Sequence, residues 1–211
     1  MRNKYIKYPR TYHLPWSLGL TKDDRVMSSL DNFIGKRVIV TVKCDGECSS
    51  LYKDYLHARS IDYSPHPSRN LLKSLHAQIQ GDIPEGWRIC GENLYAKHSI
   101  HYKNLPSYFL VFSIWNNLTC LSWDETLEWI KLLDLKCVPV LYDGIWDEKL
   151  IKNLHTPCYD SDECEGYVVR VAESFYYRDF NRCVGKFVRE NHVQTQSHWL
   201  QQKMEINGVK G

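Results

Sequence analysis

The pattern of apolar and polar positions predicts many short strands and a few helices along this 211-residue chain. β-Branched and aromatic residues gather in short runs, which is typical of strands. Residues 48–61 have the pattern of a hairpin partner, with Leu51, Tyr52, Tyr55 and Leu56 as its large side chains. The other runs predict strands at 37–43, 87–90, 108–115, 137–141, 166–171 and 183–189.

Helical spacing and capping residues predict five helices, at 21–32, 68–79, 122–135, 147–154 and 195–205. Thr21 and Ser68 are the expected caps of the first two. Ser122 and Glu125 have the spacing of a capping box that opens the third. The apolar faces expected in the core are Leu72, Leu75 and Ile79 in one helix and Trp123, Leu127 and Ile130 in another.

Strands and helices do not alternate regularly, which disfavours a doubly wound parallel sheet. The pattern favours an α+β fold of mainly antiparallel sheets flanked by helices. We find no internal repeat and no low-complexity linker, so we expect one domain over residues 1–211. Residues 1–20 carry Pro9, Pro15 and Gly19 and are expected to form an extended arm, and 195–205 a closing helix.

The composition is that of an ordinary globular protein, with 43% hydrophobic and 25% charged residues. The sequence contains no apolar run of membrane-spanning length, and its first residues lack the apolar core of a signal peptide. We therefore expect a soluble protein of the cytoplasm.

The net charge of +2 excludes a histone-like polycation. Cations and aromatics nevertheless mix near the N-terminus, a combination that suits phosphate neutralisation and base stacking. An arm that packs through its aromatics and leaves its charges in water explains the mixture equally well. The residues are Lys4, Lys7, Arg10, Lys22 and Arg25, among Tyr5, Tyr8, Tyr12 and Trp16.

The eight cysteines include no C-x-x-C pair and lie mostly in apolar or strand-like stretches. There a free cysteine behaves as a small hydrophobic residue. His155, Cys158 and Cys164 form the only grouping that suggests a metal site, but zinc needs tighter spacing. Reduced thiols of an intracellular protein are the better interpretation.

The tetrapeptide Lys43-Cys44-Asp45-Gly46 is the strongest chemical signal in the chain. It ends a β-branched run, so Lys43 and Asp45 point to the same side of an extended chain. Gly46 lets the backbone turn or approach a ligand closely. This arrangement suits a lysine that attacks a phosphorus atom.

Four further segments follow in the order found in covalent nucleotidyltransferases. They are Gly91-Glu92-Asn93-Leu94-Tyr95, Phe109–Ile114, Glu165-Gly166-Tyr167-Val168-Val169 and Gly185-Lys186-Phe187-Val188-Arg189. With them the chain resembles the ATP-dependent RNA ligases, within the wider group that includes DNA ligases and mRNA capping enzymes. Tyr8-Pro9-Arg10-Thr11 and Asn191-His192-Val193-Gln194-Thr195 also look like the compact RNA ligases that phages carry.

The resemblance implies an ATP-grasp-like nucleotidyltransferase domain that uses ATP with Mg²⁺ or Mn²⁺. Lys43 would attack the α-phosphorus of ATP and form lysyl–AMP. Asp45 is a further candidate partner of the metal or the nucleotide. The other implied roles are adenine stacking for Phe112, a place near ribose and metal for Glu92, metal binding for Glu165, α-phosphate contact for Lys186 and contact with phosphate or the RNA end for Arg59.

Each of these residues also has an ordinary structural explanation. Lys43 can be a surface lysine and Arg59 a solvated arginine, while Glu92 and Glu165 can be turn carboxylates. Phe112 can belong to the core, and Lys186 can be half of a structural ion pair. The chain also departs from the family in two places: Ser113 stands where an aspartate is common, and Arg189 stands near the usual place of a second lysine.

The predicted function is an ATP-dependent RNA ligase that joins 5′-phosphate and 3′-hydroxyl ends through lysyl–AMP. A free lysine has a pKa near ~10.4, so burial and a neighbouring cation, Lys186 or Mg²⁺, must lower that of Lys43. The short stretch after Lys186 is expected to form one helix and no OB-fold barrel. RNA strand ends are the expected partner of a monomer, with separate enzymes healing the ends.

Three other functions stay open on the sequence alone: a minimal DNA ligase, a GTP-using capping-type enzyme, and a decayed protein that only binds nucleotide or RNA.

Overall fold

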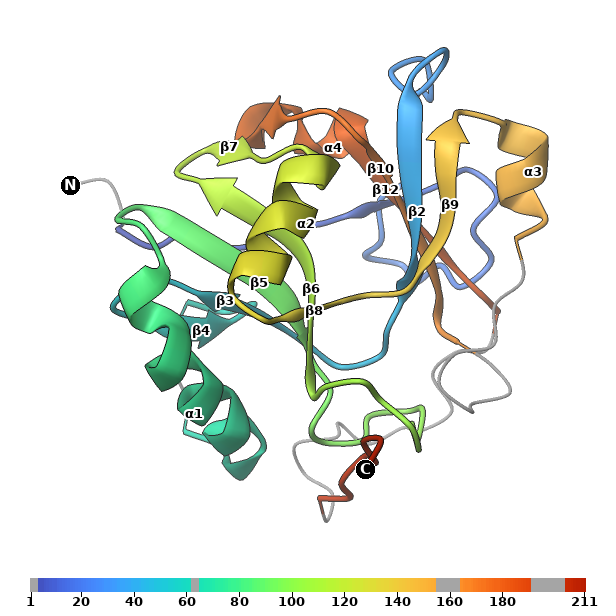
Figure 1. Cartoon of the computed structure of the whole chain (residues 1–211). Coiled ribbons are helices and arrows are strands. Elements are labelled where there is room, and N and C mark those ends of the chain that lie inside the picture. Colours follow the sequence, from blue (N-terminus) through green and yellow to red (C-terminus); the bar gives the residue numbers. More distant parts are fainter. Residues whose placement is uncertain (1–3, 62–64, 155–163, 191–203) are drawn as a thin grey trace.

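The computed structural model of the protein describes residues 4–61, 65–154, 164–190 and 204–211. Two β-sheets form its centre, and helices cover the outer face of one of them (Figure 1). The predicted α+β class with mainly antiparallel pairing is confirmed. Within the described ranges, none of the helices is long and apolar enough to cross a bilayer.

The first sheet has the strand order β1-β12-β10-β2-β9. Its strands are antiparallel except for β1, which lies parallel to β12. The apolar run that precedes the lysine motif forms β2, an interior strand between β10 and β9. The strands are β1 (Tyr12–His13), β2 (Arg37–Lys43), β9 (Val140–Ile145), β10 (Gly166–Val171) and β12 (Val184–Val188).

The second sheet has the order β11-β7-β6-β5-β3-β4, with β8 parallel to β6. Residues 48–61 were expected to be the hairpin partner of the preceding strand, but they form a hairpin of their own from β3 and β4, in a different sheet from β2. The expected strand 137–141 divides into β8 and the start of β9, which lie in different sheets, so this segment crosses between them. The strands are β3 (Glu47–Leu51), β4 (Leu56–Ala58), β5 (Trp87–Asn93), β6 (Phe109–Asn116), β7 (Thr119–Cys120), β8 (Lys136–Cys137) and β11 (Phe175–Tyr176).

The α-helices are α1 (Asn70–Ile79), α2 (Trp123–Leu132), α3 (Glu148–Lys152) and α4 (Phe180–Cys183), with 3₁₀ turns η1 (Pro67–Arg69), η2 (Gln80–Asp82) and η3 (Tyr177–Asp179). The capping box of Ser122 and Glu125 is confirmed. Ser68 does not cap α1, because it lies inside η1. Leu127 was expected in the core but is 39% exposed, and Thr126 is buried instead.

The predicted helix at 21–32 is wrong. Asp24 does accept hydrogen bonds from the Thr21 amide and hydroxyl, as the third residue of a capping box would. The chain then pairs with the arm instead of coiling: the His13 amide donates to the Arg25 carbonyl at 2.7 Å, and the Met27 amide to the His13 carbonyl at 2.8 Å. Tertiary pairing therefore overrides the local helix signal.

Within residues 4–20 the N-terminal arm has β1 as its only strand, and its aromatics pack against the protein. Tyr5 stacks on Tyr55 with ring centroids 4.4 Å apart. Trp16 donates its indole N–H to the Tyr167 hydroxyl at 2.8 Å. For these rings the packing interpretation is the one that the structure supports.

The C-terminal residues 204–211 hold the loop that follows β5. Two isolated bridges join Ala96 to Ile206 and Leu105 to Val209. The buried Asn207 donates to the Leu94 carbonyl at 2.8 Å. Residues 195–203 of the expected closing helix lie outside the described residues, and 204–205 are not helical.

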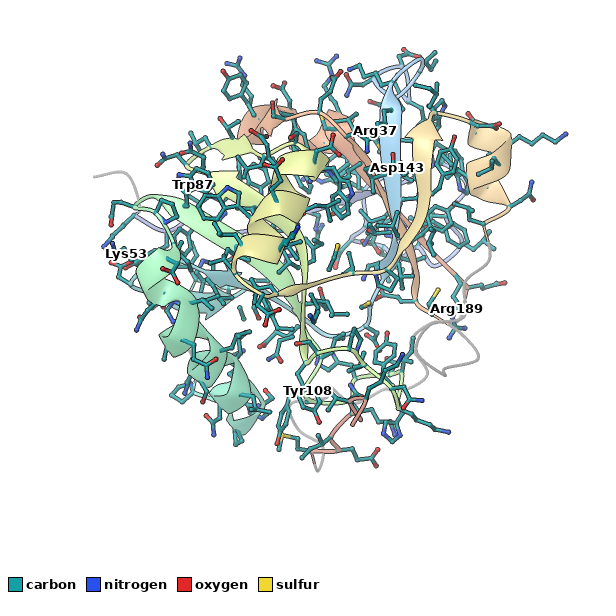
Figure 2. All side chains as sticks on the ribbon, in the orientation of Figure 1. Arg37, Lys53, Trp87, Tyr108, Asp143 and Arg189 are labelled. Atoms are coloured by element: carbon teal, nitrogen blue, oxygen red, sulfur yellow. The ribbon has the colours of Figure 1, made fainter. Side chains whose placement is uncertain are left out.

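A charged cluster ties the first sheet to α2. Arg37 at the start of β2 donates to both carboxylate oxygens of Asp143 on β9, at 2.7 and 2.8 Å. It also donates to both oxygens of Asp124 on α2. Figure 2 shows Arg37 beside Asp143 along the paired strands, away from the lysine end of β2.

Candidate active site

A cavity of about 610 Å³ opens between the two sheets. The first sheet contributes Thr41 and Lys43 of β2, Val168 of β10 and Lys186 of β12, and the second contributes Glu92 and Phe112. Val168 is the register partner of both Thr41 and Lys186, so these three side chains form one row across the sheet. Because Lys43 follows Thr41 by two residues, it lies on the same face.

Lys43 and Glu165 form an ion pair at the end of the central strands. The Lys43 Nζ lies 2.5 Å from Glu165 Oε2, and both side chains are largely buried. Their proximity follows from the register, because Lys43 is the partner of Gly166. The glutamate that precedes this glycine therefore lies beside the lysine.

Gly166, the residue after this glutamate, lets the start of β10 lie close against β12. Its φ of 153° is a conformation that residues with a side chain rarely adopt. A Cβ there would lie 2.0 Å from the Phe187 carbonyl oxygen on β12. The glycine in the Glu165-Gly166 pair is therefore required by the backbone.

Glu92 brings a second carboxylate to the cavity from the other sheet. It lies on β5 opposite Cys48, and Gly46 packs against it closely. Burial, reinforced by the charges of Glu165 and Asp45, raises the pKa of Glu92 to about 8, although Lys43 opposes the shift. Its carboxyl therefore takes up a proton readily near neutral pH.

The pKa of Lys43 is raised, contrary to the sequence-based expectation. Burial by itself lowers it, but the charges of Glu165, Glu92 and Asp45 outweigh burial. The sequence-based expectation left out the carboxylates that the fold places around the Lys43 amine. Additional positive charge is therefore needed before this lysine can act as a nucleophile.

Asp45 is buried and fixed by backbone hydrogen bonds. Its Oδ2 accepts from the amides of Ser99 and Ile100 at 2.7 and 2.9 Å. Its own amide donates to the Tyr102 hydroxyl at 2.8 Å. Asp45 thus holds the loop after β5 against the lysine motif, and its charge acts on Lys43.

Lys186 fits both interpretations of its role, because it lines the cavity and also forms an ion pair with a carboxylate. Its Nζ lies 3.4 Å from Asp24 Oδ1, and the Nε2 of buried His13 lies 3.2 Å from the same oxygen. Burial and nearby Lys43 lower the pKa of Lys186 against the pull of Asp24 and Glu165. Burial raises the pKa of Asp24, but hydrogen bonds from Thr21 and the charges of Lys186 and His13 outweigh it and lower the pKa below its usual range.

Phe112 on β6 is half-buried and lines the cavity, so one part of the ring belongs to the core and another faces the opening. Tyr8 of the arm packs edge-on against it, with centroids 5.2 Å apart. Half-buried Val168 lines the same cavity from the opposite sheet. Ser113, which replaces an aspartate, accepts the Trp115 indole N–H at 3.1 Å.

The two predicted arginines have different surroundings. Arg59 is exposed and lines the cavity, beside the arm residues Tyr8 and Arg10. Arg189 does not line it; its Nε donates to the Cys164 carbonyl at 2.8 Å, which holds the backbone next to Glu165. Arg189 therefore does not supply the charge of a second lysine in the cavity.

Sequence reasoning missed several residues at this cavity. Asp24 was assigned to a helix, and Glu47, Arg69 and His98 were not considered. Arg69 donates from Nε and Nη2 to the two oxygens of Glu47, at 2.7 and 2.5 Å. No local pattern reveals this pair, because the partners come from η1 and β3.

The carboxylates fit a divalent cation that shares its coordination with a nucleotide. No group of three or more His, Cys, Asp or Glu within the described residues could hold a metal without other ligands. Magnesium commonly uses one or two carboxylates together with phosphate oxygens and water, and Glu92 and Glu165 can provide that number. Of the suggested grouping, His155 and Cys158 lie outside the described residues, and the buried Cys164 Sγ lies 3.4 Å from the Gly166 carbonyl oxygen.

A model of the RNA ligase family matches residues 36–188, which is most of the chain. The chain belongs to the RNA ligase family. The match includes the predicted segments from Lys43 to Lys186. Among curated proteins, no match was found.

Solved structures of an RNA ligase from Naegleria gruberi have a similar fold. A mutant of it with ATP and manganese superimposes with a TM-score of 0.57 at 16% identity, covering 89% of this chain and 63% of that one. The same ligase with PPi gives 0.56 at 17% identity, covering 92% and 62%. A mutant with AMP and manganese gives 0.56 at 18% identity, covering 84% and 58%. This chain thus spans less than two thirds of the length of the ligase in these structures.

Proposed function

We propose that this RNA ligase family member is an ATP-dependent ligase that forms lysyl–AMP on Lys43 and joins 5′-phosphate to 3′-hydroxyl ends of RNA. The observation that carries the proposal is the convergence of Lys43, Glu92 and Lys186 on one cavity between the sheets, with Glu165 paired to Lys43. The similar structures from Naegleria gruberi that contain ATP or AMP with manganese support the choice of nucleotide.

In the first step the Lys43 amine attacks the α-phosphorus of ATP. A nitrogen–phosphorus bond forms, the bond from that phosphorus to the bridging oxygen breaks, pyrophosphate leaves, and the amine loses its proton. Phosphoryl transfer depends mainly on positioning and charge neutralisation. Lys186 lies on the same face of the sheet and suits the negative charge of the α-phosphate.

In the second step a 5′-phosphate oxygen of RNA attacks the AMP phosphorus, and Lys43 leaves with a proton. In the third step a 3′-hydroxyl attacks the phosphorus of the activated 5′ end, a phosphodiester forms, and AMP departs. All three steps take place beside the same carboxylates and Lys186, so one cavity serves the whole reaction.

Glu165 and Glu92 are the residues that would hold a divalent cation, either directly or through water. When bound, the cation supplies positive charge that offsets these carboxylates and the triphosphate. Glu165 also accepts a hydrogen bond from the protonated amine of Lys43 at 2.5 Å, and this contact keeps the nucleophile in place. Phe112 and Val168, one from each sheet, offer apolar surfaces between which a purine base can stack.

Covalent labelling tests this function. With ATP labelled in the α-phosphate and Mg²⁺, the protein should retain label after denaturation, and chelation of the metal should abolish labelling. Lys43→Ala should not label, whereas Lys53→Ala, which changes an exposed lysine on a surface loop (Figure 2), should label normally.

Label that persists in Lys43→Ala would remove Lys43 from its role. Labelling by GTP in preference to ATP would indicate a capping-type enzyme. Tight ATP binding without any adduct would indicate a protein that has lost the chemistry. Sealing of nicked DNA in preference to RNA would indicate a DNA ligase.

A further inference from the structure

Two surface hollows continue outward from the mouth of the cavity. The first shares Arg10 and Arg59 with the cavity, and the second shares Arg10 and Tyr177 with the first. We call their joined surface the basic groove, because it adds Lys7, Arg25 and Arg178 to these arginines. None of the described residues that line either hollow is a carboxylate.

The positive charge of the basic groove is largely uncompensated. Among the described residues, Lys7, Arg10, Arg25 and Arg59 form no ion pair, whereas the Arg178 Nε lies 3.6 Å from Asp179 Oδ2. Arg10 donates to the Asp23 carbonyl, and Arg25 to the Tyr12 hydroxyl, both neutral acceptors. Three cations inside the cavity differ, since Lys43, Arg69 and Lys186 each pair with a carboxylate.

The backbone of the arm that bears Lys7 and Arg10 is anchored. Tyr8 packs edge-on against Phe112 and Phe180, with centroids 5.2 and 5.4 Å away. The Tyr177 hydroxyl donates to the Lys7 carbonyl at 2.9 Å. The aromatic side chains thus fix the chain, while Lys7 and Arg10 remain exposed. A preformed surface of this kind binds with little ordering cost.

We propose that the basic groove binds the phosphodiester backbone of a single RNA strand, whose terminal 5′-phosphate enters the cavity past Arg10 and Arg59. Unpaired cations along a continuous hollow match the spaced charges of such a strand. Tyr12 and Tyr177 are half-exposed on the groove and offer faces for bases to stack on. This inference rests on the proposed function, because it concerns delivery of an RNA end to the same cavity.

The test compares two double variants by the fluorescence anisotropy of a 5′-phosphorylated, single-stranded RNA, without ATP and over a range of salt. Lys7→Ala with Arg25→Ala removes two groove cations that lie outside the cavity itself. Lys131→Ala with Lys149→Ala removes two exposed lysines of α2 and α3 that form no ion pair within the part of the chain that the structure describes, and is the matched control. Thermal melting checks that each variant folds.

The groove variant should bind RNA at least about ten-fold more weakly near 0.1 M salt, and the slope of log affinity against log salt should fall by roughly 1.4, or 0.7 for each phosphate contact. Lys7→Glu with Arg25→Glu should weaken binding further. The control should match the wild type. Equal affinity of groove variant and wild type, equal losses in both double variants, or no RNA binding by the wild type would overturn the proposal.

These outcomes are independent of the covalent step. A protein that labels with ATP but binds RNA without regard to Lys7 and Arg25 would retain the proposed function and exclude the groove. A protein that binds RNA through the groove but never labels with ATP would retain the groove and exclude the proposed function.

Discussion

Asp24 shows how one side chain outside every predicted motif can affect the chemistry. Its carboxylate contacts Lys186 and His13 and accepts two hydrogen bonds from Thr21. The Lys186 Nζ lies 3.4 Å from the Asp24 carboxylate, so the position of this amine depends on Asp24. We therefore expect Asp24 to position Lys186, the cation proposed to contact the α-phosphate.

We expect Asp24→Asn to slow labelling by ATP about ten-fold, which corresponds to about 1.4 kcal/mol. The change preserves shape and removes the charge that holds Lys186. A double-mutant cycle separates this role from a general effect on folding. In a protein that already carries Lys186→Ala, adding Asp24→Asn should slow labelling by ATP little further. Losses that add fully in the double variant would show that Asp24 acts independently of Lys186.

At the scale of elements, the sequence was informative where a pattern repeats locally. The β-branched run at 37–43 and the capping box at Ser122 determine their elements through neighbours along the chain, and both were predicted. The helix at 21–32 was not formed, because pairing with His13 is a long-range interaction. The division of 137–141 between two sheets also depends on partners that local sequence does not reveal.

Gly166 is the element-scale position with the sharpest expected effect. Gly166→Ala should destabilise the protein by about 3 kcal/mol and abolish labelling, because the added Cβ meets the Phe187 carbonyl and the backbone conformation is unfavourable for alanine. Urea denaturation measures the loss. Gly81→Ala is the matched control, since its Cβ meets nothing within 4 Å, and it should change stability by at most about 0.5 kcal/mol. Similar stability of the two variants would contradict this explanation of β10–β12 packing.

At the scale of the whole molecule, the family resemblance suggested which residues belong to the site, and the fold shows how they lie relative to one another. Lys43, Glu92, Phe112, Lys186 and Arg59 all line one cavity, although they come from both sheets and a loop. Glu165 lies at the cavity edge through its contact with Lys43. The Glu47–Arg69 pair and the raised pKa of Lys43 could not be predicted, because both depend on how many charges the two sheets bring together.

The central claim is that the amine of Lys43, buried among carboxylates between the two sheets, takes AMP from ATP. Its most direct test is mass spectrometry of proteolytic fragments after reaction with ATP and Mg²⁺. The account predicts that the fragment containing Lys43 gains the mass of AMP and that fragmentation assigns the added mass to this lysine. An adduct on a different residue, or ATP turnover through a protein that never carries AMP, would contradict it.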